Sequence, residues 1–323
     1  MPKIDFNKIP RFSELPIKKG APADSNWGVF GDDDEAGCVN FLTPEGVVEA
    51  ARMVRNGKVF RLDTPINYAN PPLFEREPVH HTKKSFESYG LLGFDDLLDA
   101  YNTQEGSQWD GLGHVGNLRA QAFYNGVKEG EIKTSNKLGI HNWADRFVGR
   151  GVLIDAFRYR AQAGRPVNPL NNEVYSLDDL KNALAAQKTE LKPGSILLVR
   201  TGWMGAYLAS SPEDKRKMAP IFSLKACGID PGRDTVAWMW DNRVAAIGTD
   251  CPAVEPWPWD FKDDGALHYR TLSLLGLPLG EQFVLDQLAE DCAADGRWEF
   301  MLVSVPLHLR GGIASPPNAV AIK

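Results

Sequence analysis

The segment GSQWDGLGHVGN (106–117) contains two residues that could contribute to a metal site. Asp110 stands four residues before His114, with glycines at positions 111 and 113 between them. Glycine lets the backbone turn closely enough for both side chains to reach one point. A carboxylate with an imidazole is half of a zinc or manganese site. An ordinary turn with a hydrogen-bonded histidine is the alternative for this spacing.

A second pair of candidate ligands lies late in the chain, at His268 and Glu281. The interpretation without a metal is a histidine on a helix surface and a glutamate at a helix start. Glu281 follows Gly280, and a carboxylate is favoured near a helix N-terminus. The sequence pattern alone leaves both interpretations open.

His80 and His81 are a third candidate group. Adjacent side chains diverge, so the two would rarely bind one metal together, but one of them could face a cavity and contact a substrate. The alternative is an exposed or edge-strand pair.

Several other catalytic classes lack their sequence signatures. The chain has no G-x-S-x-G elbow, no phosphate-binding G-x-x-x-x-G-K-[ST], no H-E-x-x-H, and no G-x-G-x-x-G after a strand. Its four cysteines form no C-x-x-C pair and stand in no evident activating context. We expect them to be free thiols, mostly buried.

Composition indicates an ordinary globular protein. Of 323 residues, 43% are hydrophobic and 24% charged, and the net charge is −6 without any long run of Lys or Arg. This charge disfavours a nucleic acid or an anionic membrane as partner. The N-terminal segment has no apolar signal region, and no apolar stretch approaches the roughly 20 residues of a membrane span. We therefore expect a cytoplasmic protein.

Amphipathic segments alternate with short apolar runs, which predicts an α/β class. Residues 1–35 should be an irregular lead-in, and residues 70–137 allow no clear assignment. The expected helices include 42–58, with Thr43 as cap and Pro44 in the first turn, and a helix begun by a capping box at Ser176 and Asp179. The expected strands are 59–67, 150–156, 195–203, 244–250 and 298–307. Nothing marks a domain boundary, so 1–323 is expected to be one domain.

Over roughly residues 30–323 the chain resembles the cyclase family of metal-dependent hydrolases, which includes kynurenine formamidase, isatin hydrolase and a trans-dienelactone hydrolase. Six blocks match in order: GDDDEAGCVNFLTPE (31–45), GSQWDGLGHV (106–115), LGIHNWADRFVGRGVLID (138–155), ILLVRTGW (196–203), IGTDCPAVE (247–255) and GGIASPPNAVAI (311–322). The resemblance implies an α/β fold with a central barrel-like β core surrounded by helices. It also implies a homodimer or homotetramer.

The family's metal motif, H-x-G-T-H-x-D-x-P-x-H, is only partly kept. Its aspartate and last histidine fall on Asp110 and His114, while its first two histidines fall on Gln104 and Gln108. Ser107 replaces its threonine and Leu112 its proline. Neutral amides bind divalent metals poorly. The resemblance therefore implies one metal rather than two, zinc before manganese, bound by Asp110, His114, His268 and Glu281.

The resemblance implies hydrolysis of a small amide, formamide, cyclic imide or lactone by a metal-activated water, and we favour a lactone or cyclic amide. His114 or Glu281 would move the proton, and Gln104 or Gln108 could approach the metal or hold the attacking water. The remaining candidates for a substrate wall are Trp109, Trp203, His80 and His81, with core packing as the alternative for the tryptophans. A catalytically silent binding protein and a true ring-forming cyclase are the competing functions.

Overall fold

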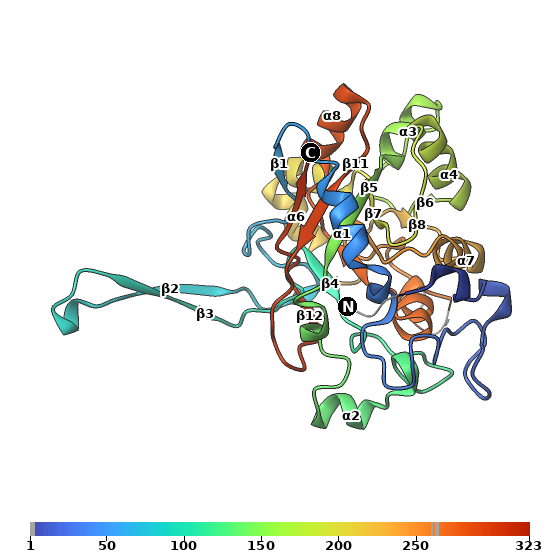
Figure 1. Ribbon diagram of the computed structural model, residues 1–323. Helices are drawn as coiled ribbons and strands as arrows, with labels where there is room; N and C mark the ends of the chain where they lie inside the picture. The colour runs from blue at the N-terminus through green and yellow to red at the C-terminus, as the bar shows by residue number, and fades with distance from the viewer. Residues whose placement is uncertain (1–3, 260, 262–264) are drawn as a thin grey trace.

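A nine-stranded curled sheet organises the computed structural model, which describes residues 4–259, 261 and 265–323. Its strand order is β1-β13-β11-β5-β7-β9-β10-β4-β12. The strands are β1 (Val59–Arg61), β4 (Gln108–Asp110), β5 (Val148–Ile154), β7 (Ile196–Val199), β9 (Ala246–Thr249), β10 (Leu279–Glu281), β11 (Glu299–Ser304), β12 (Ala314–Ser315) and β13 (Ala319–Ile322). The expected α/β class with a barrel-like β core is confirmed, since the sheet curls into a half-barrel with helices around it (Figure 1).

Helices cover this sheet. The α-helices are α1 (Pro44–Ala51), α2 (Glu129–Thr134), α3 (Ala156–Gln162), α4 (Leu177–Ala186), α5 (Trp203–Ala209), α6 (Pro212–Met218), α7 (Arg233–Asp241) and α8 (Asp286–Asp295), and a π-helix spans Tyr269–Leu275. Two further strand pairs, β2 (His80–Ser85) with β3 (Phe94–Asp99) and β6 (Val174–Tyr175) with β8 (Gly228–Ile229), lie outside the main sheet. In the described part of the chain, no helix combines the length and the apolar character of a membrane span.

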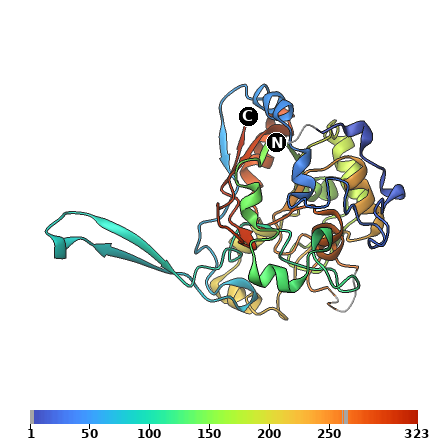
Figure 2. The ribbon, with the colours of Figure 1, turned by 60° about the horizontal axis from the view of Figure 1, so that its bottom comes forward.

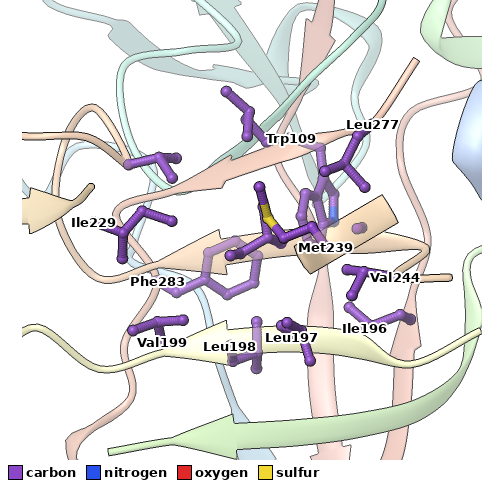
Figure 3. Packing of buried hydrophobic residues seen from close by; sticks show 14 of the residues in the cluster. Trp109, Ile196, Leu197, Leu198, Val199, Ile229, Met239, Val244, Leu277 and Phe283 are labelled. Carbon is purple, nitrogen blue, oxygen red and sulfur yellow. The ribbon is translucent and has the colours of Figure 1, made fainter. Parts of the chain in front are cut away.

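The sheet changes from parallel to antiparallel pairing at β10. The neighbours β5, β7, β9 and β10 run parallel, whereas β10 pairs with β4, and β4 with β12, in antiparallel fashion. Parallel strands are usually covered on both faces, and β7 reads Ile-Leu-Leu-Val with all four residues buried. Figure 3 shows these side chains packed with Met239 and Phe283. This core supports the strands that carry the candidate site.

Local signals in the sequence predict helix starts better than helix ends. Thr43 caps α1 by accepting a hydrogen bond from Gly46 N, and Ser176 forms a capping box with Asp179 at the start of α4. The predicted helix 42–58 is too long, because α1 ends at Ala51. Likewise only residues 59–61 of the predicted strand 59–67 join the sheet.

The unassigned segment 70–137 contains a long hairpin. Strands β2 and β3 pair over six residues each, from His80 opposite Asp99 to Ser85 opposite Phe94. Figures 1 and 2 both show this hairpin projecting away from the rest of the molecule. We call residues 77–101 the arm.

Candidate metal centre

Strands β4 and β10 bring three polar side chains to one face of the sheet. Their antiparallel register sets Glu281 opposite Gln108, and Asp110 lies two residues further along β4. Side chains two apart on a strand share a face. The Gln108 amide accordingly donates to Glu281 Oε2 at 2.5 Å, and it lies 3.4 Å from Asp110 Oδ1. All three residues are buried.

The opposite face of these strands belongs to the hydrophobic core. Trp109 is fully buried there, its ring 4.7 Å from that of Phe147 and 5.0 Å from that of Phe283. Gly280 lies opposite Trp109, where an added Cβ would come within 2.5 Å of the indole ring. Glycine at 280 thus lets the Trp109 ring pack directly against β10. This close packing is compatible with the register that sets Glu281 opposite Gln108.

A tight turn after β4 returns His114 to the site. His114 N donates to Gly111 O at 3.0 Å, and Gly111 N donates to Ile313 O at 2.9 Å. A Cβ on residue 111 would lie 2.5 Å from that Ile313 oxygen. Glycine at 111 is therefore required by the close approach of the Ile313 backbone, a reason that differs from the tight turn expected from the sequence.

His268 enters from a different element, directly before the π-helix Tyr269–Leu275. Short π-helical segments are rare and frequently occur at functional sites. Here the segment places the histidine against β4 and β10, although 157 residues lie between Asp110 and His268 in the sequence. Its side chain is 3% exposed, so the imidazole is inside the protein.

The four predicted ligands converge. His268 Nε2 lies 3.6 Å from Asp110 Oδ2 and 3.3 Å from Glu281 Oε1, and His114 Nε2 lies 3.8 Å from Asp110 Oδ1. Asp110, His114 and His268 offer ligand atoms that all lie within 4.8 Å of one another. His114 is the most accessible of the four, with 27% of its side chain exposed, so it marks the open side of the cluster.

The cluster contains polar atoms that need a partner. Asp110 Oδ2 and Gln108 Oε1 are buried and accept no hydrogen bond from the described residues. An unpaired buried oxygen, above all a charged one, is costly. A divalent cation held by Asp110, His114, His268 and Glu281 would satisfy the Asp110 oxygen, and carboxylates with imidazoles are suitable zinc or manganese ligands. The residues present therefore fit a metal ion.

The surroundings of Asp110 and Glu281 shift the pKa values of these two carboxyl groups in opposite directions. Burial opposes ionisation of Asp110, but His114, His268 and Arg76 together hold its pKa below its usual value. Burial and the nearby Asp110 charge instead raise the pKa of Glu281 to about 7. Two carboxyl groups with pKa values driven apart are typical of acid–base sites.

The two imidazoles also differ. Burial lowers the pKa of His114, despite the attraction of Asp110. Burial acts in the same sense on His268, but the Glu255, Asp110 and Glu281 carboxylates outweigh it and raise its pKa well above the usual value. His114 is thus the neutral imidazole of the pair, and His268 is the one surrounded by negative charge.

Two residues that sequence analysis did not single out support the site. Buried Glu255 holds His268 Nδ1 at 3.0 Å from both carboxylate oxygens. Arg76 donates to the backbone oxygen of Gln104 and lowers the pKa of Asp110 and Glu281. Glu255 closes the block 247–255, but no spacing in the sequence connects it with His268.

Gln104 does reach the cluster. Its side-chain nitrogen lies 2.8 Å from Asp110 Oδ1 and 3.2 Å from His114 Nε2. Both glutamine amides therefore lie beside Asp110, and their role at a metal site stays a prediction.

The other predicted substrate contacts lie elsewhere. His80 and His81 are exposed on the arm and do not face the cluster, because β2 belongs to a hairpin outside the main sheet. Trp109 and Trp203 are core residues. Trp109 packs on Phe147 and Phe283, and Figure 3 shows it among the buried residues of the core. Trp203 stacks on Tyr207 with ring centroids 4.9 Å apart. These four expectations are corrected in favour of the structural alternatives.

A different tryptophan lies at the site. The ring of Trp259 is 4.9 Å from that of His268, at an interplanar angle of 35°. Its sequence context, between two prolines and an aspartate-rich stretch, gave no signal for this contact. Trp259 is half-buried and could contact a flat substrate.

Comparison with known proteins identifies the family. The model of the family described as putative cyclase matches residues 60–256, more than half of the chain, and the protein belongs to this family. A crystal structure described as a novel cyclase shares 36% identity and a TM-score of 0.82, with 93% of this chain and 99% of that chain covered. Among curated proteins there is no significant match.

More distant structures share the fold. An isatin hydrolase bound to the product analogue thioisatinate has a TM-score of 0.57 at 14% identity, covering 87% of this chain and 98% of its own. Isatin hydrolase A from Ralstonia solanacearum has a TM-score of 0.53 at 16% identity, covering 86% and 97%. At this identity the likeness shows the fold alone.

Proposed function

We propose that the protein is a metal-dependent hydrolase that opens a small cyclic amide or lactone, using one zinc or, second, one manganese ion. The observation that carries this proposal is the convergence of Asp110, His114 and His268, whose ligand atoms all lie within 4.8 Å of one another. Glu281 Oε1 lies 3.3 Å from His268 Nε2, and the buried Asp110 Oδ2 accepts no hydrogen bond from the described residues. One of the structures that share this fold is an isatin hydrolase bound to the product analogue thioisatinate, and it motivates our choice of a small cyclic substrate.

When bound, the ion would supply Lewis-acid polarisation of the carbonyl and a more acidic water. The chain's own residues would supply positioning and proton transfer. Glu255 holds the Nδ1 side of His268, which leaves Nε2 directed at Asp110 and Glu281. Gln108 holds Glu281 Oε2 by its amide and so orients that carboxyl group.

Glu281 is the proton carrier in this proposal. Burial and the Asp110 charge raise its pKa to about 7 in the metal-free protein. A bound cation would favour the carboxylate, which is the form that accepts a proton. His114, whose pKa is lowered by burial, is neutral and is the second candidate for this role. Trp259 would provide an aromatic surface beside His268 for a flat ring.

A catalytically silent binding protein is the second candidate function. The observation that favours it is the pair of amides, Gln104 and Gln108, at positions where the family motif has histidines. Such a protein would keep the fold but show no turnover. A ring-forming cyclase would use the same groups in the reverse direction, so product analysis separates it from a hydrolase.

The decisive experiment is elemental analysis of the purified protein, followed by turnover assays with lactones, cyclic amides and formamides. We expect about one zinc or manganese ion per chain, lost in His268→Ala. His308→Ala is the control and should keep the ion, because His308 is exposed and is not one of the candidate ligands. No metal after reconstitution would contradict the proposal. Two ions per chain would show that the glutamines are ligands, and formamide turnover far above lactone turnover would refute the substrate preference.

A further inference from the structure

A cavity of about 650 Å³ lies between four segments that are distant from one another in the sequence. Its walls come from the N-terminal lead-in (12–27), the loop 117–128, the first turn of α7 and the π-helix Tyr269–Leu275. Figure 1 shows the lead-in, in blue, beside α7. None of the four candidate metal ligands lines this cavity. Its size is in the usual range of a small-molecule site, about 300–1,000 Å³.

One wall of the cavity is apolar and firmly held. Phe12, Trp27, Val236 and Leu274 line it, and each of these side chains is at most 8% exposed. The Trp27 indole is fixed by a hydrogen bond from its Nε1 to Ser273 O at 2.8 Å, which ties the lead-in to the π-helix. The wall is therefore preformed, and it offers an aromatic and aliphatic surface to a flat ring.

The rest of the lining is basic. Arg119, Lys128, Arg233 and Arg270 face a single acidic side chain, Asp24, although acidic residues outnumber basic ones over the whole chain, 42 to 36. Arg233 is paired with Asp24 at 2.8 and 2.9 Å. The side chains of Lys128 and Arg270 donate to backbone oxygens and form no ion pair with any described residue. Two positive charges at the cavity thus lack a counter-charge from the described part of the chain.

A buried amide adds a hydrogen-bond donor to this lining. Asn117 is 5% exposed, and its Oδ1 accepts from the backbone nitrogens of Arg119 and Ala120 at 3.1 and 2.8 Å. These two bonds hold the loop and fix the orientation of the amide. Its Nδ2 donates to none of the residues that the structure describes, whereas buried polar groups are normally paired. A ligand with an acceptor oxygen would supply the partner.

We propose that this cavity binds a small organic anion, a flat apolar ring that carries a carboxylate or a phosphate group. The ring would pack on the wall formed by Trp27 and Leu274. The acidic group would accept from Asn117 Nδ2 and pair with Arg270 or Lys128, since charge-assisted hydrogen bonds are the stronger ones. An inorganic anion would leave the apolar wall unused, and a neutral ring would leave the basic side chains unused. This inference does not depend on the proposed function.

The test is calorimetric titration of the full-length protein after removal of metal with EDTA, which separates the result from the chemistry of the metal centre. Benzoate and phenyl phosphate are the probes, and benzamide and inorganic phosphate each lack one half of the proposed ligand. We expect one probe molecule per chain, bound at least tenfold more tightly than benzamide or inorganic phosphate, and the tighter probe identifies the acidic group. Failure of both probes to bind, or equal binding of benzamide or inorganic phosphate, would overturn the proposal.

Two variants test the position of the site. Asn117→Asp keeps the oxygen that holds the loop but replaces the free donor by a negative charge, and Arg270→Gln removes a positive charge. We expect about tenfold weaker binding of the tighter probe in each, with unchanged circular dichroism. The matched control is Asn168→Asp, at an exposed asparagine whose Oδ1 accepts from Leu170 N at 3.2 Å outside the cavity. Wild-type affinity in both cavity variants would show that the anion binds elsewhere and would overturn the assignment.

Discussion

The carboxylate of Glu255 lies 3.0 Å from His268 Nδ1 through each of its two oxygens, deep inside the protein. A carboxylate behind a metal-binding histidine orients the ring and makes it a better ligand. We expect Glu255→Gln to weaken zinc binding about 10–100-fold. Glu290→Gln, at an exposed glutamate on α8, is the control.

A purely structural role for Glu255 would leave the titration of His268 unchanged. Because Glu255 is the strongest of the groups that raise the pKa of His268, that pKa should fall in metal-free Glu255→Gln. NMR titration of the imidazole resonances measures it. An unchanged histidine pKa would count against the positioning role.

The glutamines at the site should limit the number of metal ions. Gln104 and Gln108 both approach Asp110 Oδ1, at 2.8 and 3.4 Å, so histidines there could share that carboxylate with a second ion. The double variant Gln104→His with Gln108→His should therefore raise the metal content from about one to about two per chain. Elemental analysis measures this, with Gln121→His, at an exposed glutamine, as control. A metal content that stays at about one ion per chain would mean that the two glutamines are not what prevents binding of a second ion.

Two tryptophans should respond differently to truncation. Trp109 is fully buried and donates through Nε1 to Ser304 Oγ at 3.0 Å, so Trp109→Ala should destabilise the fold by about 3–5 kcal/mol. Trp259 is half-buried beside His268. Trp259→Ala should therefore destabilise the fold less than Trp109→Ala, and it should raise the KM for a flat substrate. Urea unfolding and steady-state kinetics measure both. A higher KM without loss of stability in Trp109→Ala would instead show that Trp109 contacts the substrate.

Stability should depend on pH through Asp250, which lies at the end of β9. Burial raises the pKa of Asp250 to about 6, against hydrogen bonds from Thr201 and Gly202 at the start of α5. The folded protein thus binds this proton more tightly than the unfolded chain, whose aspartate has a pKa near 3.9. The stability that this proton provides is present below about pH 4 and is lost as the pH rises through 6.

The lost contribution amounts to about 3 kcal/mol. The difference in unfolding free energy between wild type and Asp250→Asn should change by about this amount between pH 4 and pH 7, with the variant gaining relative to wild type. Denaturant unfolding at several pH values measures it. A difference independent of pH would show that Asp250 is ionised in the folded protein throughout this range.

The α/β class, several helix starts and the convergence of four ligands could be predicted from the sequence. Capping at Thr43 and Ser176 depends on local chemistry, which the sequence displays directly. The ligand set came from the order of family blocks and not from spacing, because Asp110 and His268 are brought together only by the tertiary fold.

Other features depend on contacts that local patterns do not contain. Glu281 could equally have started a helix, and its place on β10 is decided by pairing with β4. His80 and His81 lie on β2, whose residues are exposed on both faces, so no alternation of polar and apolar residues revealed the arm. Glu255 acts through His268, thirteen residues away in sequence and adjacent only in the folded protein.

Strand β4 carries Gln108 and Asp110 on one face and Trp109 on the other. Variant libraries of these three neighbouring positions should consequently show a period of two. A screen for protein yield would detect substitutions at position 109, because these variants fail to fold. Positions 108 and 110 would appear only in a screen for turnover, because their variants accumulate as well-folded protein that does not react. An expression screen alone would therefore classify the chemical residues of this strand as tolerant to change.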